Sequence, residues 1–182
     1  MSGPSTLEAC TIGVAIPVPD PFAAELQSWR RAFGDPLAGA IPPHITLLPP
    51  TMVAAAQLPG VEEHLAEVAA AGEPFRVRLR GTATFRPVSP VVFVALADGI
   101  SSCEMLSKAV RTGPLPGELT YPYHPHVTVA HELPDEVLDR AFAQLASYAA
   151  DFDVTAFSLY EHGADQVWRL RHSFSLGGLD GR

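Results

Sequence analysis

Apolar and polar positions along the chain alternate between the spacing of strands and the spacing of helices. Runs of apolar and β-branched residues predict strands at 11–16, 44–48, 75–80, 91–96, 126–129, 152–160 and 166–176. Apolar residues at spacings of three and four predict four helices. Their buried stripes are Phe22, Leu26, Trp29 and Phe33; Leu58, Val61, Leu65 and Val68; Cys103, Leu106 and Val110; and Leu138, Ala141, Phe142 and Leu145.

Two of the helices have start signals. Asp20 predicts an N-cap and Pro21 the first helical position of the first helix. Ser101 and Glu104 have the spacing of a capping box, which predicts the start of the third helix.

The order of the predicted elements divides the chain into two similar halves, β-α-β-α-β-β and α-β-α-β-β. Hairpins within each half and helices beside the strands favour the α+β class, in which helices cover one face of each antiparallel sheet. We therefore expect two lobes within one domain, residues 1–182, with a flexible tail at 177–182.

Two segments, 43–47 and 125–129, have nearly the same sequence: Pro-His-Ile-Thr-Leu and Pro-His-Val-Thr-Val. In each, the histidine and the threonine are two residues apart, so on a strand both side chains point to the same face. If helices cover the apolar faces, the opposite faces line a cleft with His44, Thr46, His126 and Thr128. Two imidazoles and two hydroxyls on one cleft predict a phosphate site. The alternative for either segment is a strand threonine beside a core histidine whose hydrogen-bonding groups are paired inside the protein.

Length and composition favour one well-buried domain, because the 182 residues are 47% hydrophobic and 18% charged. The formal net charge is −8. Proteins that bind along a long nucleic-acid duplex usually carry a basic stripe on their surface, which displaces counterions from the phosphates. An RNA end or a small nucleotide therefore fits this chain better than a long duplex.

The first twenty residues lack a basic segment, and Pro17 and Pro19 interrupt the apolar run 12–16. We therefore expect neither a signal peptide nor a membrane span. Cys10 and Cys103 form no Cys-x-x-Cys pair and no metal-ligand spacing, which is typical of reduced thiols. We expect a cytoplasmic monomer.

With its two motifs the sequence resembles the 2H phosphoesterase superfamily and, within it, the LigT-like group of 2'-5' RNA ligases and RNA 2',3'-cyclic phosphodiesterases. That superfamily is defined by two H-x-T-x motifs, here 44–47 and 126–129, and the string 123–129 is similar to its second motif. The resemblance implies a bilobal fold of two antiparallel sheets with outer helices and pseudo-twofold symmetry. It also implies that both motifs face a central cleft, with no metal or other cofactor. Many members carry an arginine shortly after the second motif, where this chain has His131.

Opening a 2',3'-cyclic phosphate requires that a water lose a proton while the departing ribose oxygen gains one, and histidine serves both steps near pH 7. With each Nε2 within about 3 Å of a phosphate oxygen, the two rings should lie roughly 5 to 8 Å apart. Thr46 and Thr128 would donate hydrogen bonds to the non-bridging oxygens. The resemblance implies that His44 is the acid and His126 the base. Reverse attack by a ribose hydroxyl would form a 2'-5' linkage.

Further candidates for substrate contact lie outside the four motif residues. Three arginines share one face of strand 75–80 and would hold terminal phosphates if that face lines the cleft, the alternative being a solvated face; they are Arg76, Arg78 and Arg80. Aromatic candidates for stacking a base, each alternatively a core residue, are Phe85, Tyr121, Tyr123 and Trp168. His124 either orients the site or lies in its loop. His131 reaches the substrate only if its strand ends or bulges before it.

We therefore expect a metal-independent cyclic phosphodiesterase, with 2'-5' RNA ligation as the reverse activity, acting on RNA ends or small nucleotides. One alternative is an RNA- or nucleotide-binding protein of the same fold with little turnover. Another is a metallohydrolase built from the seven histidines. No His-x-x-x-His spacing or carboxylate-rich cluster supports the metallohydrolase, and loss of activity to a chelator separates it from the first hypothesis.

Overall fold

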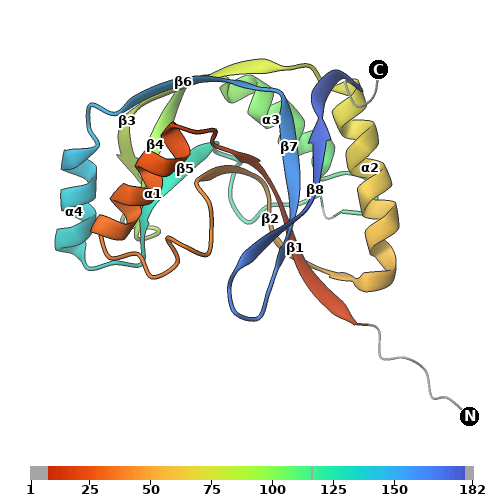
Figure 1. Cartoon of the computed structure of the whole chain (residues 1–182), viewed down its shortest axis with the longest axis horizontal. Coiled ribbons are helices and arrows are strands. Elements are labelled where there is room, and N and C mark those ends of the chain that lie inside the picture. The colour runs from red at the N-terminus through yellow and green to blue at the C-terminus, as the bar shows by residue number, and fades with distance from the viewer. Residues whose placement is uncertain (1–7, 116, 179–182) are drawn as a thin grey trace, which may run out of the picture.

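The structure, a computed structural model, describes residues 8–115 and 117–178 (Figure 1). Its strands are β1 (Ala9–Pro17), β2 (His44–Ala54), β3 (Phe75–Thr84), β4 (Val91–Asp98), β5 (His126–His131), β6 (Ala149–Val154), β7 (Ala156–His162) and β8 (Trp168–Ser175). Its helices are α1 (Phe22–Ala32), α2 (Leu58–Ala71), α3 (Ile100–Val110) and α4 (Asp135–Gln144), with short 3₁₀ turns at Ala55–Gln57 and Leu176–Gly178. The predicted α+β class is confirmed.

The strands form one curled antiparallel sheet in the order β6-β3-β4-β5-β2-β1-β7-β8 (Figure 1). The two sheets expected for two lobes are its two four-stranded halves, β6-β3-β4-β5 and β2-β1-β7-β8. A single residue pair, Ile45 opposite Val127, joins β2 to β5 between these halves. The strands that carry the two motifs are therefore neighbours at the centre of the sheet.

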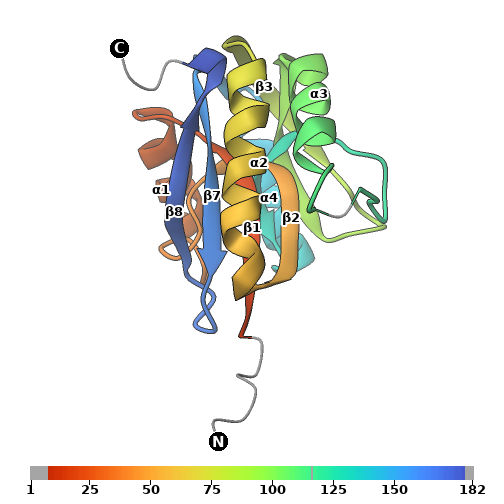
Figure 2. The ribbon, with the colours of Figure 1, turned by 90° about the vertical axis from the view of Figure 1, so that its right-hand side faces the viewer.

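Helices cover the outer face of each half. Helices α1 and α4 pack on the half that contains β5, and α2 and α3 pack side by side on the half that contains β2 (Figure 2). The apolar motif residues face these helices and are fully buried; they are Ile45, Leu47, Val127 and Val129. The side chains that alternate with them point to the opposite, partly exposed face.

The lobes differ from the two halves of the sequence. The predicted strand 152–160 is two strands, and Thr155 separates β6 from β7. Strand β6 pairs with β3 at one edge of the sheet, whereas β7 pairs with β1 and β8 in the other half. An apolar run alone carries no information about its pairing partner, so this crossing between the halves could not be predicted.

The two helix starts also differ from the prediction. Pro21 is the N-cap of α1 rather than its first helical residue, although the Asp20 carboxylate accepts a hydrogen bond from the Ala24 amide at 3.2 Å. The predicted capping box at the start of α3 is wrong. Gly99 is the N-cap, with a φ of 92° and no side-chain cap, and Ser101 already lies within the helix. A glycine is needed there because a Cβ would lie 2.7 Å from the Arg76 carbonyl oxygen.

The C-terminal tail, expected to be flexible from 177 to 182, lies partly outside the described residues. Leu176 is 1% exposed, and the 3₁₀ turn Leu176–Gly178 follows β8. Residues 179–182 fall outside the described part. No helix among residues 8–115 and 117–178 has the length and apolar character of a membrane span.

The start of α3 yields a stability prediction. We expect Gly99→Ala to lower the free energy of unfolding by about 1 to 3 kcal/mol, because alanine is strained at positive φ and its Cβ meets the Arg76 carbonyl. Ser101→Ala, the matched control, should change it by less than about 0.5 kcal/mol, since Ser101 is exposed and caps nothing. Urea unfolding of both variants measures the difference. Equal losses would contradict this account of the helix start.

Candidate active site

The register of β2 and β5 brings the two motifs together. Ile45 pairs with Val127 in an antiparallel ladder, so the residues on either side of them are also neighbours. Thr46 lies across from His126, and His44 lies across from Thr128. In this register the two histidines are diagonal neighbours on the same face, and such neighbours lie about 7 to 8 Å apart, with their Cβ atoms somewhat closer.

Both histidine rings are held in the same way. Nδ1 of His44 lies 2.7 Å from the carbonyl oxygen of Pro42, and Nδ1 of His126 lies 2.7 Å from the carbonyl oxygen of His124. A carbonyl only accepts hydrogen bonds, so Nδ1 carries the hydrogen in both rings. Each neutral ring therefore keeps its lone pair on Nε2, which is free to take or return a proton.

Aromatic side chains fix the faces of the two rings. The ring centroid of His44 lies 4.4 Å from that of Trp168, which in turn stacks on His162 at 4.2 Å. The ring of His126 packs against Phe85 at 4.9 Å and Phe93 at 5.1 Å. Each imidazole is thus supported by aromatic residues from its own half of the sheet.

The surroundings of both histidines disfavour the protonated ring. Burial lowers the pKa of His44 to about 4, helped by the positive charges of Arg30, His126 and His162, while the bond to Pro42 opposes this shift. Burial also lowers the pKa of His126, again against the effect of its carbonyl partner, and His124 adds to the lowering. In the free protein at pH 7, both rings are neutral.

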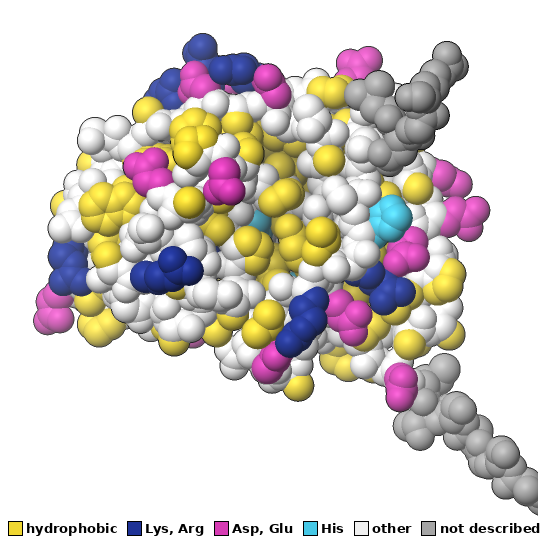
Figure 3. All heavy atoms as spheres, in the orientation of Figure 1, with side chains coloured by type: hydrophobic (Ala, Val, Ile, Leu, Met, Phe, Trp, Pro, Cys, Tyr) yellow, Lys and Arg dark blue, Asp and Glu magenta, His cyan; other side chains and the backbone are white. Residues whose placement is uncertain are grey.

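An apolar pocket of about 600 Å³ lies beside Thr46 and His126. Its walls come from β2, the β3–β4 connection and the segment before β5, and its lining residues include Phe85, Val88, Tyr121 and Tyr123. None of the lining residues is a lysine, arginine, aspartate or glutamate. Such a pocket suits a flat, uncharged group. The face of the molecule that is turned to the viewer in Figure 1 has a hollow of its own, where a histidine is visible among hydrophobic side chains (Figure 3).

The aromatic and histidine candidates divide between this pocket and the two rings. Tyr123 lines the pocket, but its hydroxyl donates to the Thr46 backbone carbonyl at 2.8 Å and so also holds β2. Tyr121 is 67% exposed at the rim. His124 is exposed, lines the pocket, and lies 6.3 Å from His126 between ring centroids. Trp168 packs against His44 instead of lining this pocket.

His131 lies on the same face of β5 as the motif residues because of a bulge. Phe93 pairs with Thr128 and Val91 pairs with His131, although these two pairs are two residues apart on β4 and three on β5. The extra residue returns His131 to the face of Thr128. Its ring is half exposed, and its Nε2 lies 3.7 Å from a Glu132 carboxylate oxygen.

The three strand arginines lie away from this pocket and form ion pairs on the surface. Arg76 contacts Asp153 at 3.0 Å, Arg78 contacts Asp98 at 3.3 Å, and Arg80 contacts Asp151 at 2.6 Å. They share one face, as predicted, but carboxylates of neighbouring strands already balance their charges. The structure does not bring them together with the two histidines.

Sequence patterns did not reveal three residues around His44 and His126, namely Arg30, Phe93 and His162. Arg30 is buried, and helical spacing could have indicated this, because Arg30 shares the stripe of Phe22, Leu26 and Phe33 on the first helix. Phe93 and His162 reach the site through strand pairing, which spacing does not show. Within the described ranges, no group of three or more histidine, cysteine, aspartate or glutamate side chains is placed to hold a metal ion.

Known proteins are similar to this chain over most of its length. A protein of Halalkalibacterium halodurans, provisionally named a phosphoesterase, is 30% identical over 167 residues, which is 91% of this chain and 96% of that protein. A Bacillus licheniformis protein with the same provisional name is 28% identical over 153 residues, 83% of this chain and 89% of that one.

Among solved structures, apo LigT of E. coli shares the fold, with a TM-score of 0.66 and 19% identity over 93% of this chain and 98% of LigT. The sequence model of the 2'-5' RNA ligase superfamily matches residues 18–166. This confirms the resemblance carried by the two motifs: the chain belongs to the 2'-5' RNA ligase superfamily of 2H phosphoesterases.

Proposed function

We propose that this phosphoesterase opens 2',3'-cyclic phosphates, or cleaves 2'-5' linkages, at RNA ends or in small nucleotides by metal-independent acid–base catalysis. The observation that carries the proposal is the diagonal pair of His44 and His126 on one face of the central strands. Both rings have Nδ1 committed to a backbone carbonyl and Nε2 free. This is the arrangement that proton transfer on two sides of one phosphorus requires.

In hydrolysis, one neutral histidine takes a proton from a water through Nε2 while the water oxygen bonds to phosphorus. The bond from phosphorus to one ribose oxygen breaks, and the second histidine, in its protonated form, gives that oxygen a proton. Thr46 and Thr128 donate hydrogen bonds to the non-bridging oxygens as charge builds on them. In ligation the 5'-hydroxyl of a second ribose replaces water. The same base takes its proton while the oxygen bonds to phosphorus, the bond from phosphorus to the 3' oxygen breaks, and the same acid protonates that oxygen, which leaves a 2'-5' linkage.

Electrostatics favours His44 as the base in hydrolysis and His126 as the acid. Burial and nearby positive charges keep His44 unprotonated down to about pH 4, which is the form a base needs. This assignment is the reverse of the one implied by the family resemblance. A phosphate anion between the rings raises the pKa of both, so that His126 acquires its proton as the substrate binds.

The apolar pocket beside His126 supports a nucleotide as substrate. Its aromatic lining and lack of charged side chains suit a nucleobase, while Thr46 and His126 at its edge suit the phosphate. LigT of E. coli has been solved in complexes with phosphate and with 3'-AMP. The net charge of −8 disfavours a long duplex.

The proposal takes the enzyme as a cytoplasmic monomer. Cys10 and Cys103 are both free thiols, which suits a reducing compartment. Both motifs of the site come from one chain, so catalysis needs no second copy.

One alternative is a nucleotide-binding protein of the same fold with little turnover. The lowered pKa values of both histidines favour it, since neither ring holds a proton in the free protein at neutral pH. Turnover measurements decide between the two functions.

Removing either ring should abolish most of the activity. We expect His44→Ala and His126→Ala each to lower kcat at least about a hundredfold, as the loss of an acid or base does. The substrates are 2',3'-cyclic nucleotides, 2'-5' dinucleotides and RNA ending in a cyclic phosphate. His172→Ala, which removes an exposed histidine of β8, is the matched control. Near-normal rates in a folded His44 or His126 variant would refute the mechanism, and absence of turnover in the wild type would favour the binding protein.

The pH dependence of kcat/KM should have its optimum on the acid side of 6.5, the ordinary pKa of histidine. The rate falls toward low pH as His44 is protonated, near pH 4. It falls toward higher pH as His126 loses its proton, because the pKa of that ring is also lowered. A rate profile from pH 3.5 to 9 tests this, and an optimum above pH 8 would contradict the assignment.

Chelation should leave the enzyme active. Because the proposed steps use only imidazole and hydroxyl groups, we expect kcat and KM to be unchanged after dialysis against EDTA. A metallohydrolase would lose its activity and recover it when a divalent cation is added back. Assays before dialysis, after dialysis and after adding metal back separate the two mechanisms.

A further inference from the structure

Among the residues that the structure describes, Arg30 is the one charged side chain in the buried set, at 6% exposure. It lies in the last turn of α1, on the same helical stripe as Leu26. Burying a guanidinium is costly unless hydrogen bonds and an opposite charge compensate it. The hydrogen-bond partners of Arg30 should therefore show what its burial achieves.

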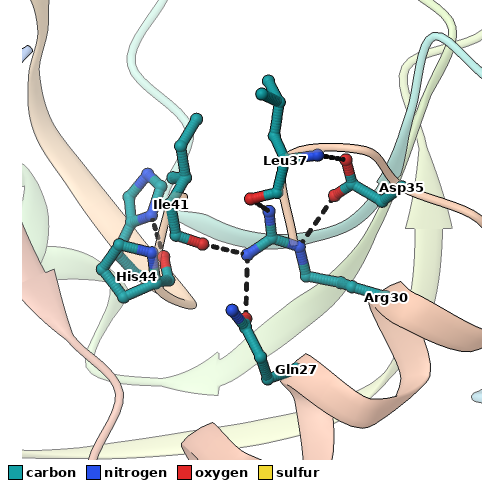
Figure 4. Close-up of polar contacts among 7 residues, drawn as sticks. Gln27, Arg30, Asp35, Leu37, Ile41 and His44 are labelled. Carbon is teal, nitrogen blue, oxygen red and sulfur yellow. Dashed lines mark hydrogen bonds and ion pairs between the residues drawn. The ribbon is translucent and has the colours of Figure 1, made fainter. Parts of the chain in front are cut away.

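The guanidinium of Arg30 forms hydrogen bonds with several residues of the segment that follows α1 (Figure 4). Nε donates to Asp35 at 2.9 Å, and Nη2 donates to the Leu37 carbonyl at 3.3 Å. Nη1 donates to the Ile41 carbonyl and to the Gln27 side chain. The second oxygen of Asp35 accepts the Leu37 amide at 2.9 Å. Residues 35–41 are thus closed around one buried cation.

The same segment leads directly to His44. Ile41 is followed by Pro42 and Pro43, whose rings fix φ and leave the backbone little freedom. The Pro42 carbonyl accepts the Nδ1 hydrogen bond of His44 at 2.7 Å. A shift of the Ile41 carbonyl would therefore be transmitted to the imidazole.

Trp168 of β8, in the same half of the sheet as His44, also holds this segment. Its amide donates to the Ala40 carbonyl at 3.0 Å, and its ring packs on His44 at 4.4 Å. Arg30 and Trp168 therefore both fix the backbone that precedes His44. Arg30 itself does not line the pocket beside His126.

We propose that Arg30 is a positioning residue for His44: it fixes residues 35–43 so that Nε2 of His44 points at the reacting phosphate. The inference rests on the proposed role of His44, because positioning matters only for a group that reacts. The charge of Arg30 acts in the same direction, since it favours the neutral ring that a base requires. The other titratable groups that act on His44 are His126 and His162, and in their protonated forms both also favour the neutral His44 ring.

The second motif has a weaker counterpart of this anchor. Arg111, at the end of α3, donates to the Gly117 carbonyl at 2.6 Å in the segment before β5. That contact is exposed and lies nine residues before His126, whereas the Ile41 contact is part-buried and lies three residues before His44. The pseudo-twofold arrangement is therefore asymmetric at the ring that we assign as the base.

Two variants test the proposal. Arg30→Lys keeps the charge but loses the planar fork that reaches Leu37, Ile41 and Asp35 together. Arg30→Gln combined with Asp35→Asn removes the charge without leaving a buried carboxylate unpaired. Arg31→Gln, which removes an exposed arginine from the same helical turn, is the matched control.

We expect kcat to fall about tenfold or more in both test variants with little change in KM, because Arg30 does not touch the substrate. In the double variant, NMR titration of His44, assigned with the His44→Ala spectrum, should show a raised pKa. In Arg30→Lys that pKa should stay near the wild-type value. Arg31→Gln should match the wild type in kcat, KM and the His44 pKa.

Circular dichroism and thermal melts establish that each variant folds, and Arg30→Lys alone carries the test if the double variant does not. Wild-type kcat in folded Arg30→Lys, or an unchanged His44 pKa in the folded double variant, would overturn the proposal. The titration needs no turnover. A wild type without phosphodiesterase activity would therefore refute the proposed function, while the pKa comparison would still report on Arg30.

Discussion

A single antiparallel contact, Ile45 opposite Val127, decides where the reactive groups of this protein lie. It joins the two halves of the sheet and sets the register of both motifs at once. A slip of one residue in either strand would turn its apolar side chains outward. Each strand contributes two fully buried motif residues, Ile45 and Leu47 or Val127 and Val129, so the slip would cost about 3 to 6 kcal/mol. That is a large part of the stability of a typical domain, about 5 to 15 kcal/mol, so hydrophobic burial holds the histidines in place.

The same burial shapes the chemistry of the site. Aromatic rings help to bury the imidazoles, and burial lowers the pKa of both against the opposing effect of their carbonyl partners. None of the residues that line the apolar pocket beside them is a carboxylate, so none there stabilises a protonated ring. An incoming phosphodiester anion therefore brings a negative charge next to the two rings. Binding of the anion and uptake of a proton are coupled, and the proposed acid becomes active only when substrate is present.

The two lobes are built from interleaved parts of the chain. Helix α1 covers the half that contains β5, yet the segment after it, anchored by Arg30, leads into His44 of the other half. Trp168 of β8 contacts both that segment and the His44 ring. Each motif therefore depends on elements distant in sequence, and the pseudo-twofold pairing of the motifs does not extend to the residues that support them.

The sequence by itself determined the periodicity of most elements, the α+β class and the family. It also indicated which motif side chains share a face, since alternation on a strand is a local property of the backbone. Alternation cannot show which strands pair. Only the tertiary structure divided 152–160 between the two lobes, turned His131 back to the face of Thr128 through a bulge, and paired Arg76, Arg78 and Arg80 with carboxylates. The burial of Arg30 and the stacking of Trp168 on His44 also depend on contacts between distant segments. Local spacing determines where a side chain points, whereas long-range packing determines what it meets there.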